Sequence, residues 1–341
     1  MSHNLIDLFC GAGGFSYGFY KKGYNVLLGV DNDRYCVETF LKNHKTSKGI
    51  IEDIKKIKKE DITNILLDQK IDLIIGGPPC QGFSAAGKRD PKDPRNSLFK
   101  EFVRLVNEFQ PKWFIMENVS GLVSMKTEKK EKVIDIILTE FKKIGYNVDY
   151  KIIDAVNFGV PQFRKRVFII GNNLNKKIIF PEPTQTEYAK DSKKKLKTVR
   201  ETISDLVELK SGEKSNDPLH FAFNHPERHL KWMENVPEGK SAHENKDPSL
   251  RPKSGYKTTY KRIWWDRPSP TITTCIGHIS SQNKVHPSQN RALTLRESAR
   301  LQTFPDEYFF AGKITNIKKQ IGNAVPPKLS EVFAEHLLKI W

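Results

Sequence analysis

Short apolar runs alternate with amphipathic stretches along the first half of the chain. The apolar runs have strand length and are bounded by Gly, Pro or Asn. Between residues 97 and 109 apolar side chains recur at helical spacing, and 132–146 behaves likewise and ends at Gly145, a typical C-cap. Strands alternating with helices predict an α/β fold with a mostly parallel sheet covered on both faces. The predicted strands are 4–9, 25–30, 71–77, 112–119, 149–155 and 166–172.

The pattern changes near residue 180. From there to about 285 the periodicity fades, and His, Trp, Lys and Pro become common, most densely at 221–233 and 255–268. Helical patterns return later, at 293–304 and 328–341. We therefore predict a first domain over 1–180, a smaller irregular domain over 181–285, and a C-terminal segment over 286–341 that returns to the first domain.

Composition narrows the class of protein. The chain has 57 Lys and Arg against 40 Asp and Glu, a net charge of +17, which favours a polyanionic partner such as nucleic acid. A solvated lysine-rich surface is the alternative. No apolar run approaches the roughly 18 residues of a membrane span, and the start leaves no room for a signal peptide. The 4 cysteines include no CxxC pair, so we expect a reduced cytoplasmic protein without a metal site.

A glycine-rich turn follows the first predicted strand, in DLFCGAGGFSYGF (residues 7–19). Its glycines let the backbone approach a ligand closely, and the helix start offers free N–H groups. Asp31 ends the next strand, where an acid can accept hydrogen bonds from ribose hydroxyls, and Asp53 is placed to accept from an adenine amino group. These positions indicate a nucleoside cofactor. The alternative is that both acids merely cap helices.

Cys80 lies in the segment GGPPCQGFSAAGKRDPKDPRNSLF, directly after a predicted strand. Ligands of open α/β sheets bind at the carboxyl ends of strands, so the thiol should face the same crevice as the cofactor. Two prolines stiffen its approach, and the basic residues Lys88, Arg89 and Arg95 favour a thiolate. A buried structural cysteine is the alternative, but the polar residues that follow offer no apolar face. The sequence favours a nucleophile.

Two further polar groups follow buried strands. Glu117 ends the run KWFIMENV, as a candidate acid–base group or as an ordinary strand-end acid. QFRKR sets Arg164 and Arg166 two residues apart, on one face of a strand, where their guanidinium groups suit a phosphate and a carbonyl oxygen.

Together the motifs DLFCGAGGF, GGPPCQGFSAAGKR, MENV, QFRKR, LTLRESARLQTFPD and QIGNAVPP resemble those of the DNA cytosine-5 methyltransferase family, in the family's order. They leave only about 180–265 without a family signature. The resemblance implies a Rossmann-like S-adenosylmethionine-dependent methyltransferase of the prokaryotic type, monomeric and paired with a restriction endonuclease. It would methylate a cytosine flipped out of double-stranded DNA.

Three rival functions share part of this pattern. The tRNA-directed branch of the family has a short cysteine-containing motif that is not apparent here. A catalytically silent DNA-binding module would be free to lose Cys80, Glu117 and Arg166. A nicotinamide-dependent oxidoreductase would explain only the glycine-rich turn and Asp31.

The resemblance also implies a role for each catalytic candidate. Cys80 would attack C6 of the cytosine, and Glu117 would hydrogen-bond to N3 and the exocyclic amine. Arg166 would hold the O2 side, while Arg164 would serve a phosphate or the loop 81–97. That loop would close over the flipped base.

Two larger sets of residues complete the expected sites. In the set expected to bind the cofactor, Phe9 would stack on the adenine. The other members of this set are Gly11, Ala12, Gly13, Gly14, Asp31, Asn32, Asp53, Ile54, Pro78 and Asn323. The candidate DNA contacts are Gln81, Ser84, Lys88, Arg89, Arg95, His225, Arg228, His229, Lys231, Lys257, Lys261, Arg262 and Trp265. Trp264 and Trp265 could equally be local core, and we expect Cys275 to be structural.

Overall fold

The computed structural model describes residues 3–67, 69–79, 98–128, 130–187, 191, 194–253, 255–280 and 283–341. The chain divides into two compact units. Unit 1 contains Met1–Asp154, Lys165–Glu182 and Leu329–Trp341, and unit 2 contains Ala155–Arg164 and Pro183–Lys328. The main boundary lies close to the predicted residue 181. The return to the first unit differs from the prediction, because it begins at residue 329 rather than 286.

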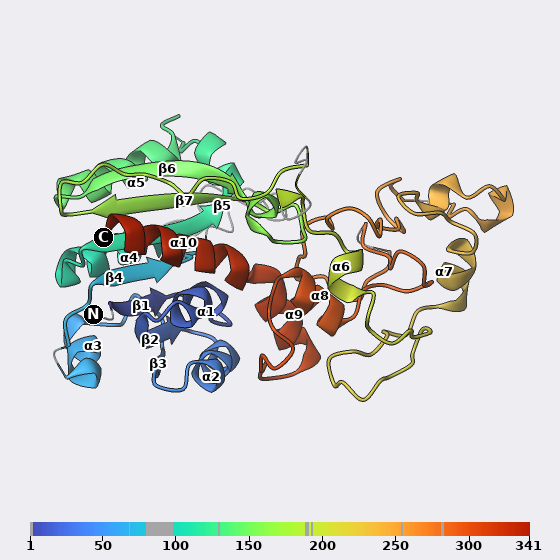
Figure 1. The fold of residues 1–341 in the computed structure, drawn as a ribbon, viewed down its shortest axis with the longest axis horizontal. Helices are drawn as coiled ribbons and strands as arrows, with labels where there is room; N and C mark the ends of the chain where they lie inside the picture. The colour runs from blue at the N-terminus through green and yellow to red at the C-terminus, as the bar shows by residue number, and fades with distance from the viewer. Residues whose placement is uncertain are drawn as a thin grey trace. The chain divides into compact units, whose positions relative to one another are not determined.

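Unit 1 is built on a mixed seven-stranded sheet with the order β3-β2-β1-β4-β5-β7-β6 (Figure 1). The first five strands pair in parallel, whereas β7 is antiparallel to both β5 and β6. This confirms a mostly parallel α/β sheet. The strand bounds are β1 (Asn4–Leu8), β2 (Asn25–Asp31), β3 (Lys48–Ile51), β4 (Leu73–Gly76), β5 (Trp113–Val119), β6 (Asn147–Asp154) and β7 (Lys165–Asn172).

Helices cover both faces of this sheet. On one face Phe114 of β5 stacks on Phe141 of α5 with ring centroids 4.0 Å apart. On the other face Phe168 of β7 packs on Phe333 of α10 at 4.4 Å, and the Tyr24 hydroxyl donates to the Ala334 carbonyl at 3.2 Å. The helices of this unit are α1 (Gly14–Lys21), α2 (Arg34–Asn43), α3 (Lys59–Leu66), α4 (Leu98–Phe109), α5 (Val133–Lys143) and most of α10 (Pro327–Ile340).

The end of β4 has no room for a side chain. A Cβ added to Gly76 would lie 2.1 Å from the carbonyl oxygen of Leu8, its ladder partner in β1. Glycine is therefore required where the chain leaves the sheet, and the parallel ladder between β1 and β4 fixes where the following residues begin.

Unit 2 has few regular elements among its described residues, and short bridges link its loops. One apolar cluster consists of Met233, Val236, Ala242, Tyr260, Ile279, Val285 and Ala292. The predicted helical segment 293–304 is confirmed as α8. The helices are α6 (Arg200–Ile203), α7 (Glu227–Trp232), α8 (Leu295–Leu301) and α9 (Ile314–Asn323). No helix in the described ranges of either unit is long and apolar enough to cross a membrane.

A buried charge cluster joins α8 to the preceding loop of unit 2. Arg291 donates to both carboxylate oxygens of Glu297, at 2.9 and 2.7 Å, and the Nε2 of His286 lies 3.7 Å from the same carboxylate. Hydrogen bonds and the positive charge of Arg291 lower the pKa of Glu297 to about 2, against its desolvation, and burial lowers the pKa of His286 to about 4. Both groups therefore resist protonation in the folded state.

We expect unit 2 to lose stability as the pH falls. Both folded-state pKa values lie below the unfolded ones, so the stabilisation is present at neutral pH. The contribution of His286 is lost between about pH 6.5 and 4, and that of Glu297 between about pH 4.5 and 2. Thermal unfolding of the wild type and of His286→Gln between pH 7 and 4 checks this. An identical pH dependence in both proteins would contradict it.

Candidate active site

Glu117 and Arg166 form an ion pair across two neighbouring strands of unit 1. Val119 of β5 is paired with Arg166 of β7, so Glu117 and Arg166 are diagonal neighbours on one face of the antiparallel ladder. The Nε of Arg166 lies 3.0 Å from Oε1 of Glu117, and the two side chains are 19% and 12% exposed. The pair is thus mostly buried yet reachable, as a site for a small polar group requires.

The chain that leaves β4 is held beside this pair. A Cβ added to Gly77 would lie 3.1 Å from Oε2 of Glu117, so the missing side chain leaves room for that carboxylate. The side-chain amide of Asn118 donates to the carbonyl of Pro78 at 2.9 Å. Backbone and side chains therefore fix residues 77–79 against the end of β5.

Cys80 follows directly in the chain but lies outside the described residues, as do Gln81, Ser84, Lys88, Arg89 and Arg95. Their roles therefore stay predictions. The structure describes the chain up to Pro79, the residue before Cys80. The carbonyl of Pro78 accepts the hydrogen bond from the side-chain amide of Asn118.

The glycine-rich turn after β1 leaves open space above its backbone. Phe9 and Gly11 have positive φ angles of 62° and 51°, and a Cβ added to Gly11 would meet no atom of the described residues within 4 Å. The N–H of Gly11 donates to Asp31 at 2.9 Å. A tight turn with an open face over Gly11 is a cradle that a ligand could fill.

Asp31 is not the cap of α2. Asp33 occupies that position and accepts from the Tyr35 N–H at 2.9 Å, whereas Asp31 accepts from Gly11 and from Asp33. Burial raises the pKa of Asp31, and its backbone hydrogen bonds act in the opposite direction. The capping alternative for Asp31 is therefore wrong, and its carboxylate ties the end of β2 to the glycine-rich turn.

The other residues predicted for the cofactor follow β2 and β3. Asn32 is exposed, Ile54 is buried, and Asp53 is half-buried and accepts from the Lys55 N–H at 3.0 Å. This contact belongs to a turn and not to a helix cap, since α3 begins at Lys59 with Lys58 as its N-cap, and the contact of Asp53 with an adenine stays a prediction. Ala12 and Gly14 are buried in the turn and at the start of α1.

Asp7 is a buried acid beside the turn that the sequence analysis did not single out. Its carboxyl is buried in β1, and its Oδ2 has no hydrogen-bond partner among the described residues. Gly13, the N-cap residue, makes no side-chain cap, and the hydroxyl of Ser16, the third residue of α1, donates to the Gly13 carbonyl at 3.2 Å. Burial raises the pKa of Asp7 to about 7. The signal was an acid inside an otherwise apolar strand.

The structure separates Arg164 from Arg166. The Arg164 side chain is 1% exposed and donates to the carbonyls of Ile272 and Gly322 at 3.0 and 3.1 Å, all within unit 2. The predicted phosphate contact is wrong, because a guanidinium enclosed by backbone carbonyls cannot reach an external phosphate. Arg164 instead links two distant segments, as does its neighbour Gln162, which binds the Leu301 carbonyl and the Ile272 N–H.

Asn323 lies at the C-terminal end of α9, in unit 2, with an exposed side chain. Its predicted place in the cofactor pocket stays a prediction. Within unit 1, the hydroxyl of Ser330 in α10 donates to the carbonyl of Phe15 in α1.

The predicted DNA contact of Arg262 is wrong. It was expected to contact DNA, but it is 4% exposed and donates to the carbonyls of Val236, Met233 and His286 at 2.7, 2.9 and 2.9 Å. Desolvation lowers its pKa to about 10, so it remains charged at neutral pH. Arg262 fastens loops of unit 2 together and is not available to a partner.

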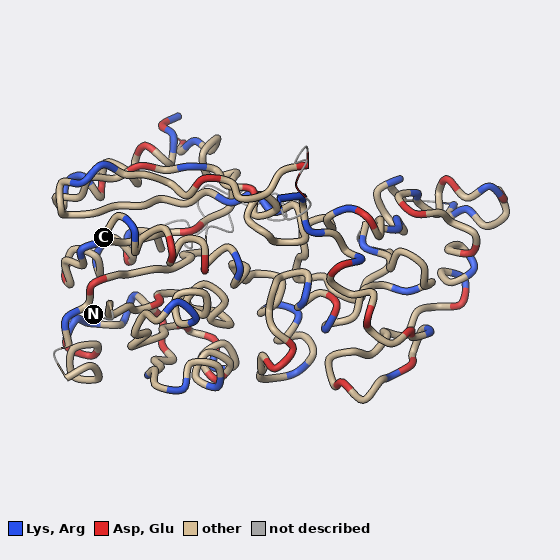
Figure 2. The backbone as a smooth tube through the Cα atoms, viewed as in Figure 1, with Lys and Arg blue, Asp and Glu red and all other residues tan. Residues whose placement is uncertain are grey.

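The remaining candidates of unit 2 differ in exposure. His225 accepts from the Ala292 N–H at 3.1 Å, and burial lowers its pKa to about 4, so it is a neutral structural side chain. Arg228, Lys231 and Lys257 are exposed, although Lys231 forms an i,i+4 ion pair with Glu227. Figure 2 shows Lys and Arg interspersed with acids along this unit. His229 stacks on Trp232 with centroids 5.1 Å apart.

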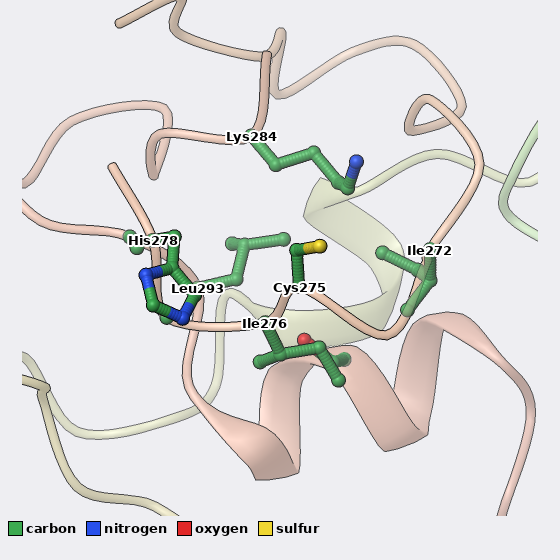
Figure 3. Close-up of a pocket in the computed structure, with 9 residues that line it drawn as sticks. Ile272, Cys275, Ile276, His278, Lys284 and Leu293 are labelled. Carbon is green, nitrogen blue, oxygen red and sulfur yellow. The ribbon is translucent and has the colours of Figure 1, made fainter. Parts of the chain in front are cut away.

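Cys275 lines a small pocket of unit 2 (Figure 3), with an empty volume of about 230 Å³. Its side chain is exposed, and its structural role stays a prediction. Burial lowers the pKa of Lys284, which lines the same pocket, to about 8. Neither member of the Glu117–Arg166 pair lines this pocket.

Comparison with known proteins places these features in one family. The family model of C-5 cytosine-specific DNA methylases matches residues 3–339. The chain is 41% identical to the Type II methyltransferase M1.HphI of Haemophilus parahaemolyticus, covering 100% of this chain and 88% of that protein. It is 38% identical to the Type II methyltransferase M.DdeI of Desulfomicrobium norvegicum, covering 98% and 88%.

Solved structures of methyltransferases are also similar to this chain. A protein encoded within a prophage, from E. coli and described as a DNA modification methyltransferase, shares 26% identity and a TM-score of 0.77, with 99% of both chains covered. The fold alone is shared with Schizosaccharomyces pombe Dnmt2, at 17% identity and a TM-score of 0.65. With a match to the family model over nearly its whole length, the chain belongs to the C-5 cytosine-specific DNA methylase family.

Proposed function

We propose that this methyltransferase transfers a methyl group from S-adenosylmethionine to C5 of one cytosine in a specific double-stranded DNA sequence. The Glu117–Arg166 pair supports this proposal best. It offers a carboxylate and a guanidinium, 3.0 Å apart and largely shielded from solvent, at the end of β5. Cytosine presents a ring nitrogen, an exocyclic amine and a carbonyl oxygen along one edge, and these groups complement such a pair.

The residues of the glycine-rich turn fit S-adenosylmethionine. The open face above Gly11 has room for its methionine part, and Phe9 would stack on its adenine. Asp31, fixed by the Gly11 and Asp33 N–H groups, would accept from the ribose hydroxyls, and Asp53 would accept from the adenine amine. When bound, S-adenosylmethionine supplies an electrophilic methyl group.

The chemistry begins at Cys80. C5 of cytosine is a poor nucleophile, so the Cys80 thiolate first forms a bond to C6 and pushes an electron pair towards C5. Glu117 accepts from the exocyclic amine and, in its protonated form, donates to N3, while Arg166 donates to O2, so that charge entering the ring is stabilised. C5 then forms a bond to the methyl group as the bond between that group and the sulfonium sulfur breaks; the electron pair of the broken bond stays on the sulfur, which would leave as a neutral thioether. Loss of the C5 proton to a base, here proposed to be a water or hydroxide, returns the electron pair and expels the thiolate.

Unit 2 is proposed to recognise the target sequence. Its exposed basic residues and its irregular loops suit contacts with phosphates and base edges. The closing loop 81–97 would cover the extruded base. We place the protein in the cytoplasm as a monomer, the modification enzyme of a restriction–modification system whose endonuclease reads the same site.

Bisulfite sequencing of DNA from cells that express the protein tests the proposal. We expect protected cytosines at one recurring sequence, which would also identify the recognition site. Unmodified DNA with methylated tRNA from the same cells would instead support the tRNA-directed alternative.

Gly77→Ala should impair catalysis with little effect on folding. The new Cβ would lie 3.1 Å from Oε2 of Glu117, so the carboxylate must shift by a few tenths of an ångström. A small misplacement of a catalytic group lowers kcat by on the order of tenfold to a hundredfold. Methylation kinetics and thermal unfolding check this.

The neighbouring glycine provides the control. Gly76→Ala would place a Cβ 2.1 Å from the Leu8 carbonyl and should destabilise the fold instead. If Gly77→Ala retained full kcat, the placement of Glu117 beside Gly77 would have no catalytic importance.

A further inference from the structure

In unit 2, the side chains of Lys261 and Arg267 both lie over the ring of Trp264. The Nζ of Lys261 lies 5.4 Å from the ring centroid of Trp264, and the guanidinium carbon of Arg267 lies 5.0 Å from the same centroid. Both distances fall within the range of a cation–π interaction. Trp264 therefore contacts two positively charged groups at the surface, since Arg267 is exposed and Lys261 is half-exposed.

The backbone around this tryptophan is fixed. A Cβ added to Gly239 would lie 2.1 Å from the Trp264 ring, so the ring sits directly on the backbone there. The Gly239 N–H donates to the Arg262 carbonyl at 3.1 Å, and the Trp265 N–H donates to Glu238 at 2.8 Å. The buried guanidinium of Arg262 donates to the carbonyl of Val236, in the same segment of the chain as Gly239. The cation pair thus sits on a rigid support.

Neither of these two cations forms an ion pair among the described residues, although the charge of Lys261 also acts on Glu244. Elsewhere in unit 2 exposed cations form ion pairs, such as Arg200 with Asp266 at 2.6 Å and Lys240 with Glu244 at 3.2 Å. Within the described ranges of the chain, neither Lys261 nor Arg267 has a carboxylate at salt-bridge distance. Arg200 makes the contrast direct, because it lies 5.3 Å from the Trp265 centroid yet is paired with Asp266.

We infer that Lys261, Trp264 and Arg267 form a preorganised phosphate clamp for the DNA backbone. The ring holds both side chains in place, so less conformational entropy is lost when a phosphate binds. Such a contact positions the duplex on unit 2 without reading its sequence. The inference rests on the proposed DNA substrate, and it assigns Arg267, which the sequence reading did not single out, to DNA binding.

Salt dependence of binding to a short, fluorescently labelled duplex of arbitrary sequence tests the clamp in the full-length protein. Each phosphate contact contributes about 0.9 to the slope of log K against log salt concentration. Lys261→Gln and Arg267→Gln should each reduce the slope by about 0.9 and weaken binding roughly eightfold at 0.1 M salt. Arg200→Gln, which removes a cation already paired with Asp266, should leave the slope unchanged.

Trp264 variants test the preorganisation. Trp264→Leu should weaken binding at all salt concentrations, whereas Trp264→Phe, which keeps a ring, should restore most of the affinity. Thermal unfolding of each variant establishes that it is folded. Folded Lys261→Gln and Arg267→Gln proteins with the wild-type slope would overturn the clamp. Methylation by the wild type is measured separately, so these results can contradict the phosphate clamp without contradicting the proposed function.

Discussion

Cys80→Ser is expected to abolish methyl transfer while cofactor binding stays close to that of the wild type. A serine hydroxyl is far less acidic than a thiol, so it supplies almost no anion to attack C6. Loss of a catalytic nucleophile typically lowers kcat by on the order of 10⁴-fold or more. Transfer of a labelled methyl group to DNA measures the first effect, and calorimetric titration with S-adenosylmethionine measures the second.

Cys275→Ser is the matched control for Cys80→Ser. Cys275 is exposed and lines the pocket of unit 2 that neither Glu117 nor Arg166 lines, so its removal should leave the rate unchanged. Substantial residual turnover in Cys80→Ser would rule out the proposed nucleophile.

Glu117→Gln should slow the chemical step far more than it weakens DNA binding. The substitution keeps the shape of the side chain but removes the charge that faces Arg166 at 3.0 Å. Removing one such preorganised group usually costs about 10² to 10³ in kcat. Single-turnover methylation separates this effect from the dissociation constant for DNA, which we expect to change only slightly.

A surface glutamate controls for the loss of a charge. Glu140 forms an exposed i,i+3 ion pair with Lys143 at 2.6 Å, and Glu140→Gln should have wild-type kinetics. A Glu117→Gln protein with normal single-turnover rates and weak DNA binding would assign Glu117 to binding alone.

The architecture of unit 1 was largely predictable because its strands are short apolar runs separated by amphipathic helices. The direction of β7 was not, since the run VFIIGN reads the same in a parallel or an antiparallel strand. That direction matters, because the antiparallel ladder of β5 and β7 places Arg166 diagonally beside Glu117.

The arginines show where sequence reasoning fails. Arg164 and Arg166 are two residues apart, yet β7 begins at Lys165, so strand alternation does not include Arg164. Arg262 lies in a basic, aromatic stretch that resembles a binding surface. Its carbonyl partners Val236 and His286 are 26 and 24 residues away in the chain, so no local pattern could reveal its burial.

Trapping on 5-fluorocytosine DNA tests the covalent route most directly. Once bisulfite sequencing has identified the target, a duplex with 5-fluorocytosine at that position is incubated with protein and S-adenosylmethionine. Fluorine at C5 blocks the proton loss that expels the thiolate. We predict a denaturation-resistant complex whose mass equals protein plus methylated DNA, with the link at Cys80. The absence of any adduct on DNA that the protein otherwise methylates, or a link at another residue, would contradict the account.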